Sequence, residues 1–487
     1  MTSALRGIAL AAATVALTSC GDDPITPPAQ PVIVVLAGNN QQALPATALN
    51  QQLQVLVHDD GTPVAGVEVT WQVTAGAGSI EPTNAVTNAT GHATATLTLG
   101  PALGINTVVA TAQGVDGQAT FTATAVTDPP TGALLVAEVA IPSNYGIHDT
   151  FVRDGIAFVA AWNSGIMIYD VGGGTRGGSP SSPQLISQYV PPSGGVAGGA
   201  QVHNSWWFHN PTNDQKKYLF VGQEGPAVVG LNASGDLKVF DVTNMAAPLE
   251  VATLRIPDAG VHNFWMDESA QVLYAAWYNG GVVAVDVSGT LTGNLSSRII
   301  GQAFPGGAGN AYVWGVMFSA GTLYASDMLN GFFAIDPTTM ALKNTAANVT
   351  NRFTSDLWVH GNVAYTGTWG SRGGNRGNVI NIWNLGAGGA PTLANALEIT
   401  GVGTVSDVAV TPDGSLLVAT AESGAGNGLH LFTRVDPLNP VSVDQLTVAQ
   451  GLHTGEVAVI GGRTYVFAAR NPPNPALMIF DITGVGP

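Results

Sequence analysis

The chain contains little positive charge. Only 15 of its 487 residues are Lys or Arg, against 32 Asp or Glu, and the formal net charge is −17. Proteins that bind nucleic acid neutralise phosphates with clustered Lys and Arg, and this composition excludes such clusters. We therefore expect no nucleic-acid partner, and we assign the acidity to solubility.

Cysteine is almost absent, since Cys20 is the only one. A lone cysteine rules out an internal disulfide framework, a CxxC metal site and a CxxCH haem site. The sequence also lacks a Gly-x-Ser-x-Gly elbow, an HExxH motif, a Walker loop and an Asp-rich calcium loop. No complete catalytic set is present in one motif, so a site must be assembled from residues far apart in the chain.

Residues 1–20 have the pattern of an export signal. Arg6 precedes an apolar run from Ile8 to Leu17 that is too short to span a bilayer. The ending Leu-Thr-Ser-Cys resembles the lipobox of bacterial lipoproteins, which implies acylation of Cys20 and a membrane anchor without a spanning helix. Gly21, not Asp, follows the cysteine. The resemblance predicts a lipid-anchored protein of the cell envelope, on the outer membrane, facing the periplasm or on the cell surface. The alternative is an ordinary signal peptide with an incidental cysteine.

Glycine is abundant and charge is scarce, with 62 Gly, 29 Pro and only 10% charged residues. This composition suits many short strands joined by turns and predicts an all-β protein. Residues 21–31, "GDDPITPPAQP", form a Pro-rich tether that cannot bury a core.

Residues 32–127 alternate apolar and polar side chains, as in "VEVTWQV" and "HATATLTLG", with Gly, Asn or Asp between the runs. Period-two runs of this kind predict an antiparallel β-sandwich. The stretch resembles bacterial immunoglobulin-like domains of the invasin type, which implies a spacer or adhesive stalk, with Trp71 as its core aromatic residue.

Residues 133–487 contain a repeat of four strands. The third strand recurs as "IMIYDV", "LKVFDV", "VVAVDV" and "LMIFDI", and seven inner strands begin near residues 149, 204, 263, 315, 356, 407 and 456. Seven four-stranded units at this period predict a seven-bladed β-propeller. The sequence of these third strands resembles the LVIVD-type propeller repeat, although Pro337, Asn384 and Thr433 break the pattern in blades four to six.

The ends of this region predict how the ring closes. The chain ends at "ALMIFDITGVGP", a third strand with no fourth strand after it, whereas an unassigned strand at residues 134–142 precedes blade one. We expect this N-terminal strand to complete the last blade and remove its open edge.

Equal positions in the blades form rings around the axis. One ring is predominantly acid or amide; its members are Asp149, Asn204, Asn263, Gly315, Asp356, Asp407 and Glu456. Short polar side chains at a strand entry commonly cap backbone N–H groups, and we favour that role over ligand binding. The Asp residues that end the third strands are expected to cap turns; they are Asp170, Asp241, Asp286, Asp336 and Asp481.

The ring one residue earlier contains His148, His203 and His262, with His453 near the comparable position in blade seven. Imidazole is a common ligand of divalent transition metals, so these residues are candidate metal ligands. The alternative, which we favour, is that each His packs between blades and bonds a neighbouring carbonyl. Adjacent side chains of a strand point to opposite faces, so we expect only one of the two rings to face the channel.

A third set of residues ends the second strands at the same rim. Its members are Trp162, Glu224, Trp277, Asp327, Trp369, Glu422 and Arg470. Trp combines a flat apolar face with an N–H donor, so this set predicts a rim that binds a carbohydrate or protein ligand, unless the Trp side chains only pack between blades.

The sequence thus favours an exported, non-enzymatic binding module that presents a propeller on an immunoglobulin-like spacer. The alternative is a propeller enzyme, such as a metal-assisted hydrolase or polysaccharide lyase, with the His residues as metal ligands and Asp149 or Glu422 as base. A purely structural envelope protein is a third hypothesis.

Overall fold

The computed structural model describes residues 31–49, 51–59, 62–127, 132–142, 146–193, 199–225, 228–343, 351–386 and 390–486. The export-signal segment, Cys20 and residues 21–30 of the tether lie outside these ranges. Within them, no helix is long and apolar enough to cross a membrane.

The N-terminal region consists of two sheets of short strands. The first has the order β1-β3-β8-β6, with β4 on β3, and the second the order β2-β10-β9-β5-β7. Their bounds are β1 (Val32–Ala37), β2 (Gln41–Ala43), β3 (Leu53–Asp59), β4 (Thr62–Pro63), β5 (Glu68–Ala75), β6 (Ser79–Glu81), β7 (Asn84–Val86), β8 (His92–Thr98), β9 (Gly104–Ala112) and β10 (Ala119–Ala125).

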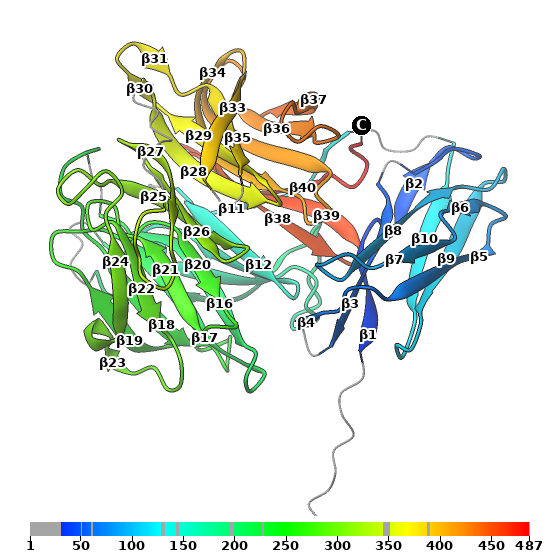
Figure 1. Cartoon of the computed structure of the whole chain (residues 1–487), viewed down its shortest axis with the longest axis horizontal. Coiled ribbons are helices and arrows are strands. Elements are labelled where there is room, and N and C mark those ends of the chain that lie inside the picture. Colours follow the sequence, from blue (N-terminus) through cyan, green and yellow to red (C-terminus); the bar gives the residue numbers. More distant parts are fainter. Residues whose placement is uncertain are drawn as a thin grey trace, which may run out of the picture.

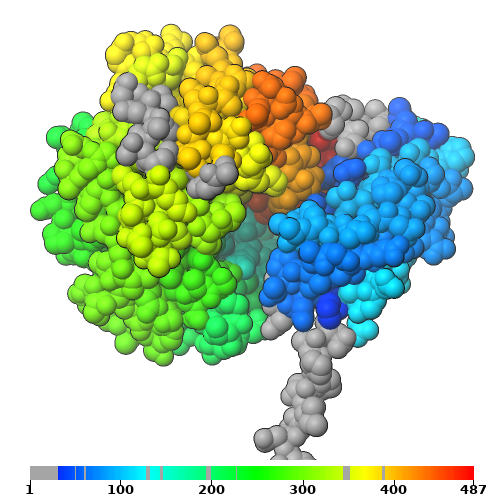
Figure 2. Space-filling model, viewed as in Figure 1, coloured from blue at the N-terminus to red at the C-terminus, as the bar shows by residue number. Residues whose placement is uncertain are grey.

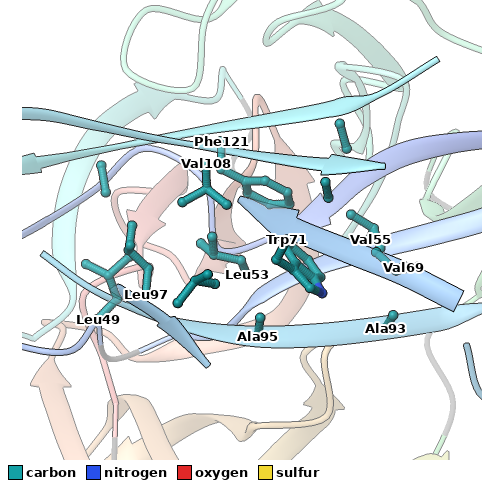
Figure 3. Close-up of a cluster of buried hydrophobic side chains, with 14 of the residues drawn as sticks. Leu49, Leu53, Val55, Val69, Trp71, Ala93, Ala95, Leu97, Val108 and Phe121 are labelled. Carbon is teal, nitrogen blue, oxygen red and sulfur yellow. The ribbon is translucent and has the colours of Figure 1, made fainter. Parts of the chain in front are cut away.

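One hydrophobic core holds these two sheets together. Trp71 on β5 is 2% exposed and its ring lies 5.7 Å from that of Phe121 on β10. Leu53 and Val55 on β3 belong to the same cluster, as Figure 3 shows. Buried residues alternate with more exposed ones along β8 and the first half of β5, which is the period-two pattern that the sequence displays.

The remaining described strands form seven groups, which we call blades one to seven; the pair Thr368 and Val405 joins blades five and six into one sheet. Their strands are β12 (Asp149–Arg153), β13 (Ile156–Ala160), β14 (Ile166–Asp170) and β15 (Gln184–Tyr189) in blade one; β16 (Val202–Asn210), β17 (Gln215–Gln223), β18 (Asp236–Asp241) and β19 (Leu249–Arg255), with β23 (Gly293–Asn294), in blade two; β20 (Phe264–Asp267), β21 (Val272–Ala276), β22 (Val282–Asp286) and β24 (Ile299–Ala303), with a 3₁₀ turn at Ser296–Arg298, in blade three; and β25 (Val313–Ser319), β26 (Thr322–Asp327) and β27 (Gly331–Ile335) in blade four.

The last three blades follow the same plan. They contain β28 (Phe353–His360), β29 (Val363–Trp369), β32 (Val379–Leu385) and β33 (Pro391–Glu398), with the hairpin β30 (Ser371–Arg372) and β31 (Asn375–Arg376), in blade five; β34 (Val402–Val410), β35 (Leu416–Gly424), β36 (Gly428–Thr433) and β37 (Val441–Thr447) in blade six; and β38 (Leu452–Ile460), β39 (Arg463–Arg470), β40 (Ala476–Asp481) and β11 (Leu134–Ala140) in blade seven.

The blades close into a ring. Each innermost strand contacts the next one in the order β12, β16, β20, β25, β28, β34, β38, and β38 returns to β12. The strand β11, from the beginning of the region, pairs antiparallel with β40 near its end, from Leu134 opposite Asp481 to Ala140 opposite Ala476. The fold is a β-propeller, and β11 covers the outer edge of its last blade (Figure 1).

The Asp residues that end the third strands cap turns, as their spacing predicts. Asp170 accepts hydrogen bonds from four backbone N–H groups of the following loop, including those of Gly172 and Gly173 at 3.0 and 2.9 Å. Asp336 accepts two, from Thr338 and Thr339. The other three members each accept one from the residue two positions later.

The N-terminal sheets contact blades six and seven. Asn40 Nδ2 donates to the carbonyl of Gly461 at 2.7 Å, and Gln51 Nε2 donates to Asp413 at 2.9 Å. Both partners lie in turns after an innermost strand has ended. Figure 2 shows the blue N-terminal sheets against the orange and red blades. The contact is therefore at the end of the channel opposite to the strand entries.

Candidate metal centre

Four histidines from consecutive blades meet where the innermost strands begin. His453 comes from blade seven, His148 from blade one, His203 from blade two and His262 from blade three. The ring centroids are 4.5 Å apart for His453 and His148, 4.9 Å for His148 and His203, and 4.0 Å for His203 and His262. We call these four side chains the histidine arc.

Irregular strand entries explain how the histidine arc and the acid–amide ring both reach the channel. The pairing register shifts between Val202 and Asn204, which flank His203, and between Leu452 and Gly455, which flank His453. His148 and His262 precede their strands. A bulge breaks the alternation of side chains, so residues of both rings line one cavity, among them His203 and Asp407. The expectation that only one ring faces the channel is wrong, because it assumed regular strands.

His203 is the central member of the histidine arc and has no hydrogen-bond partner among the described residues. Its side chain is 1% exposed, and neither ring nitrogen is paired. Its ligand atom lies within 4.8 Å of those of His148 and His453 in one group, and of those of Glu224 and His262 in another. Buried polar atoms almost always find a partner, so an imidazole with two unpaired nitrogens requires an explanation.

In two members of the histidine arc, one ring nitrogen contacts an oxygen atom that fixes the orientation of the ring. The second ring nitrogen of each remains available as a metal ligand. His262 Nδ1 lies 2.7 Å from the carbonyl oxygen of Trp314 in the next blade, as the packing hypothesis expects. His453 Nδ1 contacts the carboxylate of Glu422. A carboxylate or carbonyl that holds one imidazole nitrogen is the usual way in which proteins orient a metal-ligating histidine.

A carboxylate completes the cluster. Glu224 Oε2 lies 3.6 Å from His203 Nε2, and Glu224 Oε1 accepts a 2.5 Å hydrogen bond from the hydroxyl of Tyr278. Burial raises the pKa of Glu224 to about 7, although the bond from Tyr278 opposes this shift. The cluster thus offers four imidazoles and one carboxyl group in a site where solvent is nearly excluded.

Burial also sets the charge of the imidazoles. It lowers the pKa of His148, His203 and His262 well below the ordinary value, and repulsion from neighbouring imidazoles adds to this effect. For His453, burial is outweighed by the nearby Glu422 carboxylate, so its pKa is raised. Neutral imidazoles keep a lone pair for a metal ion.

A small pocket of about 130 Å³ adjoins the histidine arc. Its remaining walls are aromatic or apolar, and include Tyr278, Tyr312, Trp314, Met328 and Trp369. The sequence did not single out the two tyrosines or Met328. Their signal is weak because each lies in a loop or at a strand end, where no repeat period marks it.

The acid–amide ring occupies the next layer of the channel and is partly engaged within the protein. Asn263 Nδ2 donates to Asp356 at 3.0 Å, and Asp407 accepts from the backbone N–H of Gly455 at 2.8 Å. The ring lacks a side chain in blade four because a Cβ atom on Gly315 would lie 2.4 Å from Asp356 Oδ1. Burial, followed by the nearby Asp407 carboxylate, raises the pKa of Asp149 to about 7.

Two of the three Trp side chains in the third set are buried, as expected of Trp that only packs between blades. Trp277 is 0% exposed, Trp162 is 6% exposed, and Asp327 is buried while it accepts the N–H of Tyr312 at 2.6 Å. Glu224 and Glu422 contact the histidine arc instead, and Trp369 lines the pocket beside it.

A one-residue offset accounts for the position of Trp277. Trp162 bridges Val202 of the next blade, and the residue that makes the corresponding bridge in blade three is Tyr278, which pairs with Val313. Both residues have a positive φ, 49° and 41°, which is uncommon for bulky side chains. A shift by one position turns a side chain to the other face, so Trp277 points into the core.

Comparisons with known proteins agree with this fold. A family model of the LVIVD repeat matches residues 148–190, which begin at His148 and span blade one. A chain in the crystal structure of the Mitotic Checkpoint Complex has 14% identity and a TM-score of 0.53, over 73% of this chain and 94% of that chain. A solved β-propeller domain from Myceliophteria thermophila has 12% identity and a TM-score of 0.49, over 72% and 99%. No curated protein matches. The chain therefore contains an LVIVD repeat in blade one, and the ring of contacts among its innermost strands gives the β-propeller fold.

Proposed function

We propose that the propeller binds one divalent transition-metal ion at His203, with either His148 and His453 or His262 and Glu224 as further ligands. The observation that carries the proposal is His203, whose two buried ring nitrogens make no hydrogen bond to the described part of the chain although other imidazoles and a carboxyl group lie nearby. An imidazole that only packed between blades would bond a neighbouring carbonyl, as His262 does through one nitrogen.

The donor set favours zinc or copper. Imidazole nitrogen suits Zn, Cu, Ni and Fe, whereas Mg and Ca prefer sites made of oxygen. One group of ligand atoms contains three imidazoles, and the other contains two imidazoles and one carboxyl group, with His203 common to both. Glu422 and the carbonyl of Trp314 would orient two of the imidazoles from behind.

Metal analysis tests the proposal. The purified full-length chain is dialysed against micromolar Zn, Cu or Ni and then against metal-free buffer, and we expect about one ion per chain. The variant His203→Ala should retain almost none. The matched control, His92→Ala on β8 of the N-terminal sheets, should retain the wild-type amount. A wild-type chain without bound metal, or equal retention in both variants, would contradict the proposal.

A catalytic role for this metal site is a second candidate function. The supporting observation is the pocket beside the histidine arc, whose volume of about 130 Å³ gives room for a small ligand next to a bound ion. Glu224, with its raised pKa and its bond from Tyr278, is positioned as a proton acceptor or donor. Hydrolysis of small esters by the metal-loaded protein, lost in Glu224→Gln with metal retained, would distinguish catalysis from simple binding.

The proposed location of the protein depends on the N-terminal sequence. We place it at the cell envelope, anchored by a lipid on Cys20, with the two N-terminal sheets as a spacer of the immunoglobulin-like type. The spacer contacts the end of the channel opposite to the histidine arc, so it leaves the metal site uncovered. The variant Cys20→Ser should move the protein from the membrane fraction to the soluble one. Unchanged membrane association would contradict the anchor.

A further inference from the structure

A second cavity lies further along the channel, away from the histidine arc. It has a volume of about 210 Å³ and is lined by the innermost strands of all seven blades. Four carboxyl groups line it, those of Asp149, Asp356, Asp407 and Glu456, and none of its lining residues is Lys or Arg. The metal site proposed above uses none of these carboxyl groups.

Aromatic side chains form the next layer of the same cavity. Phe151, Trp206, Trp265 and Trp358 each follow a member of the acid–amide ring by two positions, so they point to the same side of their strands. Their ring centroids are 5.0, 5.3 and 6.1 Å apart in that order, and each side chain is partly exposed. This aromatic arc was not predicted, although its members follow the acid–amide ring at a constant spacing of two residues in the sequence.

Three buried polar atoms at the cavity are unpaired among the described residues. They are Thr150 Oγ1, Asn204 Oδ1 and Ser205 Oγ, on side chains that are 2%, 2% and 4% exposed. All three residues line the cavity. Thr150 and Ser205 alternate with residues that face the cavity, so their side chains point to the other side of their strands. Asn204 Oδ1 is the atom of the three that a hydroxyl group of an occupant or a bound water can reach, and a buried oxygen without a donor is costly.

We propose that this cavity binds a small organic ammonium ion. Burial, followed by repulsion from neighbouring carboxylates, raises the pKa of Asp356 and Glu456. A cation bound among these groups favours their charged form and relieves the repulsion. The faces of Trp and Phe favour weakly hydrated cations such as quaternary ammonium groups. A bare Ca²⁺ or Mg²⁺ ion is disfavoured because it needs six or more oxygen ligands, whereas aromatic side chains form part of the wall of this cavity. The cavity has room for a group of several heavy atoms.

Choline is the probe, because a neutral isostere exists in which carbon replaces its ammonium nitrogen. The full-length protein is titrated with each compound by calorimetry in the presence of a chelator, so that the metal site plays no part. We expect one choline per chain and at least tenfold weaker binding of the neutral alcohol, since only the charge differs. Equal affinities, or no heat with choline, would overturn the proposal.

Variants locate the binding. Glu456→Gln keeps the shape of the side chain and should weaken choline binding about fivefold, and Trp265→Leu should weaken it about tenfold. The control Glu138→Gln changes a carboxylate on β11 of the same blade, where it pairs with Arg470 outside the channel, and should change nothing. Unchanged affinity in Glu456→Gln would place choline elsewhere and overturn the proposal, whether or not Trp265→Leu folds. His203→Ala should bind choline normally, which separates this site from the metal centre.

Discussion

The two halves of the channel mouth use the same position of the innermost strands, but the polar side chains at that position differ in their hydrogen bonding. In blades five and six the position is held by serines. Ser355 Oγ donates to the carbonyl of Val405 at 2.6 Å, and Ser406 Oγ donates to that of Leu452 at 3.2 Å. In the opposite half the same layer contains the histidine arc, in which His203 makes no hydrogen bond to any described residue.

The difference separates architecture from function within one repeat. A side chain that only closes the gap between blades needs one hydrogen bond to the next blade, and serine supplies it without further cost. Four imidazoles in one half leave several buried nitrogens unpaired, which lowers stability unless a ligand binds them. We therefore assign the serine half to structure and the histidine half to metal binding.

Metal should stabilise the protein through the histidine half alone. When free metal exceeds the dissociation constant a thousandfold, the free energy of unfolding should rise by about 4 kcal/mol. This gain should disappear in His453→Ala and persist in Ser406→Ala, as measured by urea unfolding with and without metal. Loss of the gain in both variants would remove the distinction between the halves.

The second-largest effect is expected when the ring is opened at the outer edge of blade seven. If a Gly-Ser segment of equal length replaces Leu134–Ala140, blade seven loses its outer strand and the partly buried Val136 and Val139 lose their packing. We expect a loss of about 3 kcal/mol in the free energy of unfolding and weaker metal binding, because His453 and His148 lie on either side of this junction. Unchanged unfolding by urea would contradict the role of β11.

The variant Glu422→Gln tests the histidine half without removing a metal ligand. Its carboxylate contacts Nδ1 of His453, so Glu422→Gln should leave the chain folded while it weakens metal affinity at least tenfold, as usual for groups that orient ligating histidines. Competition with a chelator of known affinity measures this change. Full affinity in the variant would mean that His453 needs no orienting group.

The smallest effect is expected in the serine half. Ser355→Ala removes one hydrogen bond from a side chain that is 0% exposed and leaves the carbonyl of Val405 with one acceptor bond fewer. The free energy of unfolding should fall by about 1 kcal/mol, equally with and without metal. A change in metal stoichiometry would show that this half takes part in binding.

Much of the architecture is predictable because repeats and alternation depend on local chemistry. The recurring third strand gives the blades, and the unmatched strand before blade one indicates where the ring closes, next to β40. The Asp residues that follow the third strands can be recognised as caps because their partners lie only a few residues away.

The candidate site was predictable only in part. His148, His203 and His262 can be recognised because they stand at the same position of three repeats. The proximity of His453 to them depends on the contact between blades seven and one. The sequence places Trp277 with the set at the channel mouth, but a one-residue offset in a turn puts its side chain in the core. Glu224 and Tyr278 come from different blades, and their contact has no signature in the sequence.

By itself, the sequence determined an acidic all-β chain with repeated strands, one cysteine and histidines at the start of three repeats. These features depend only on composition and on the spacing of neighbouring residues. Only the tertiary structure decided which of those side chains meet. Ring closure brings blades seven, one, two and three together, and irregular strand entries turn two adjacent residues toward one channel. Contacts between residues hundreds of positions apart follow from packing, which no local pattern records.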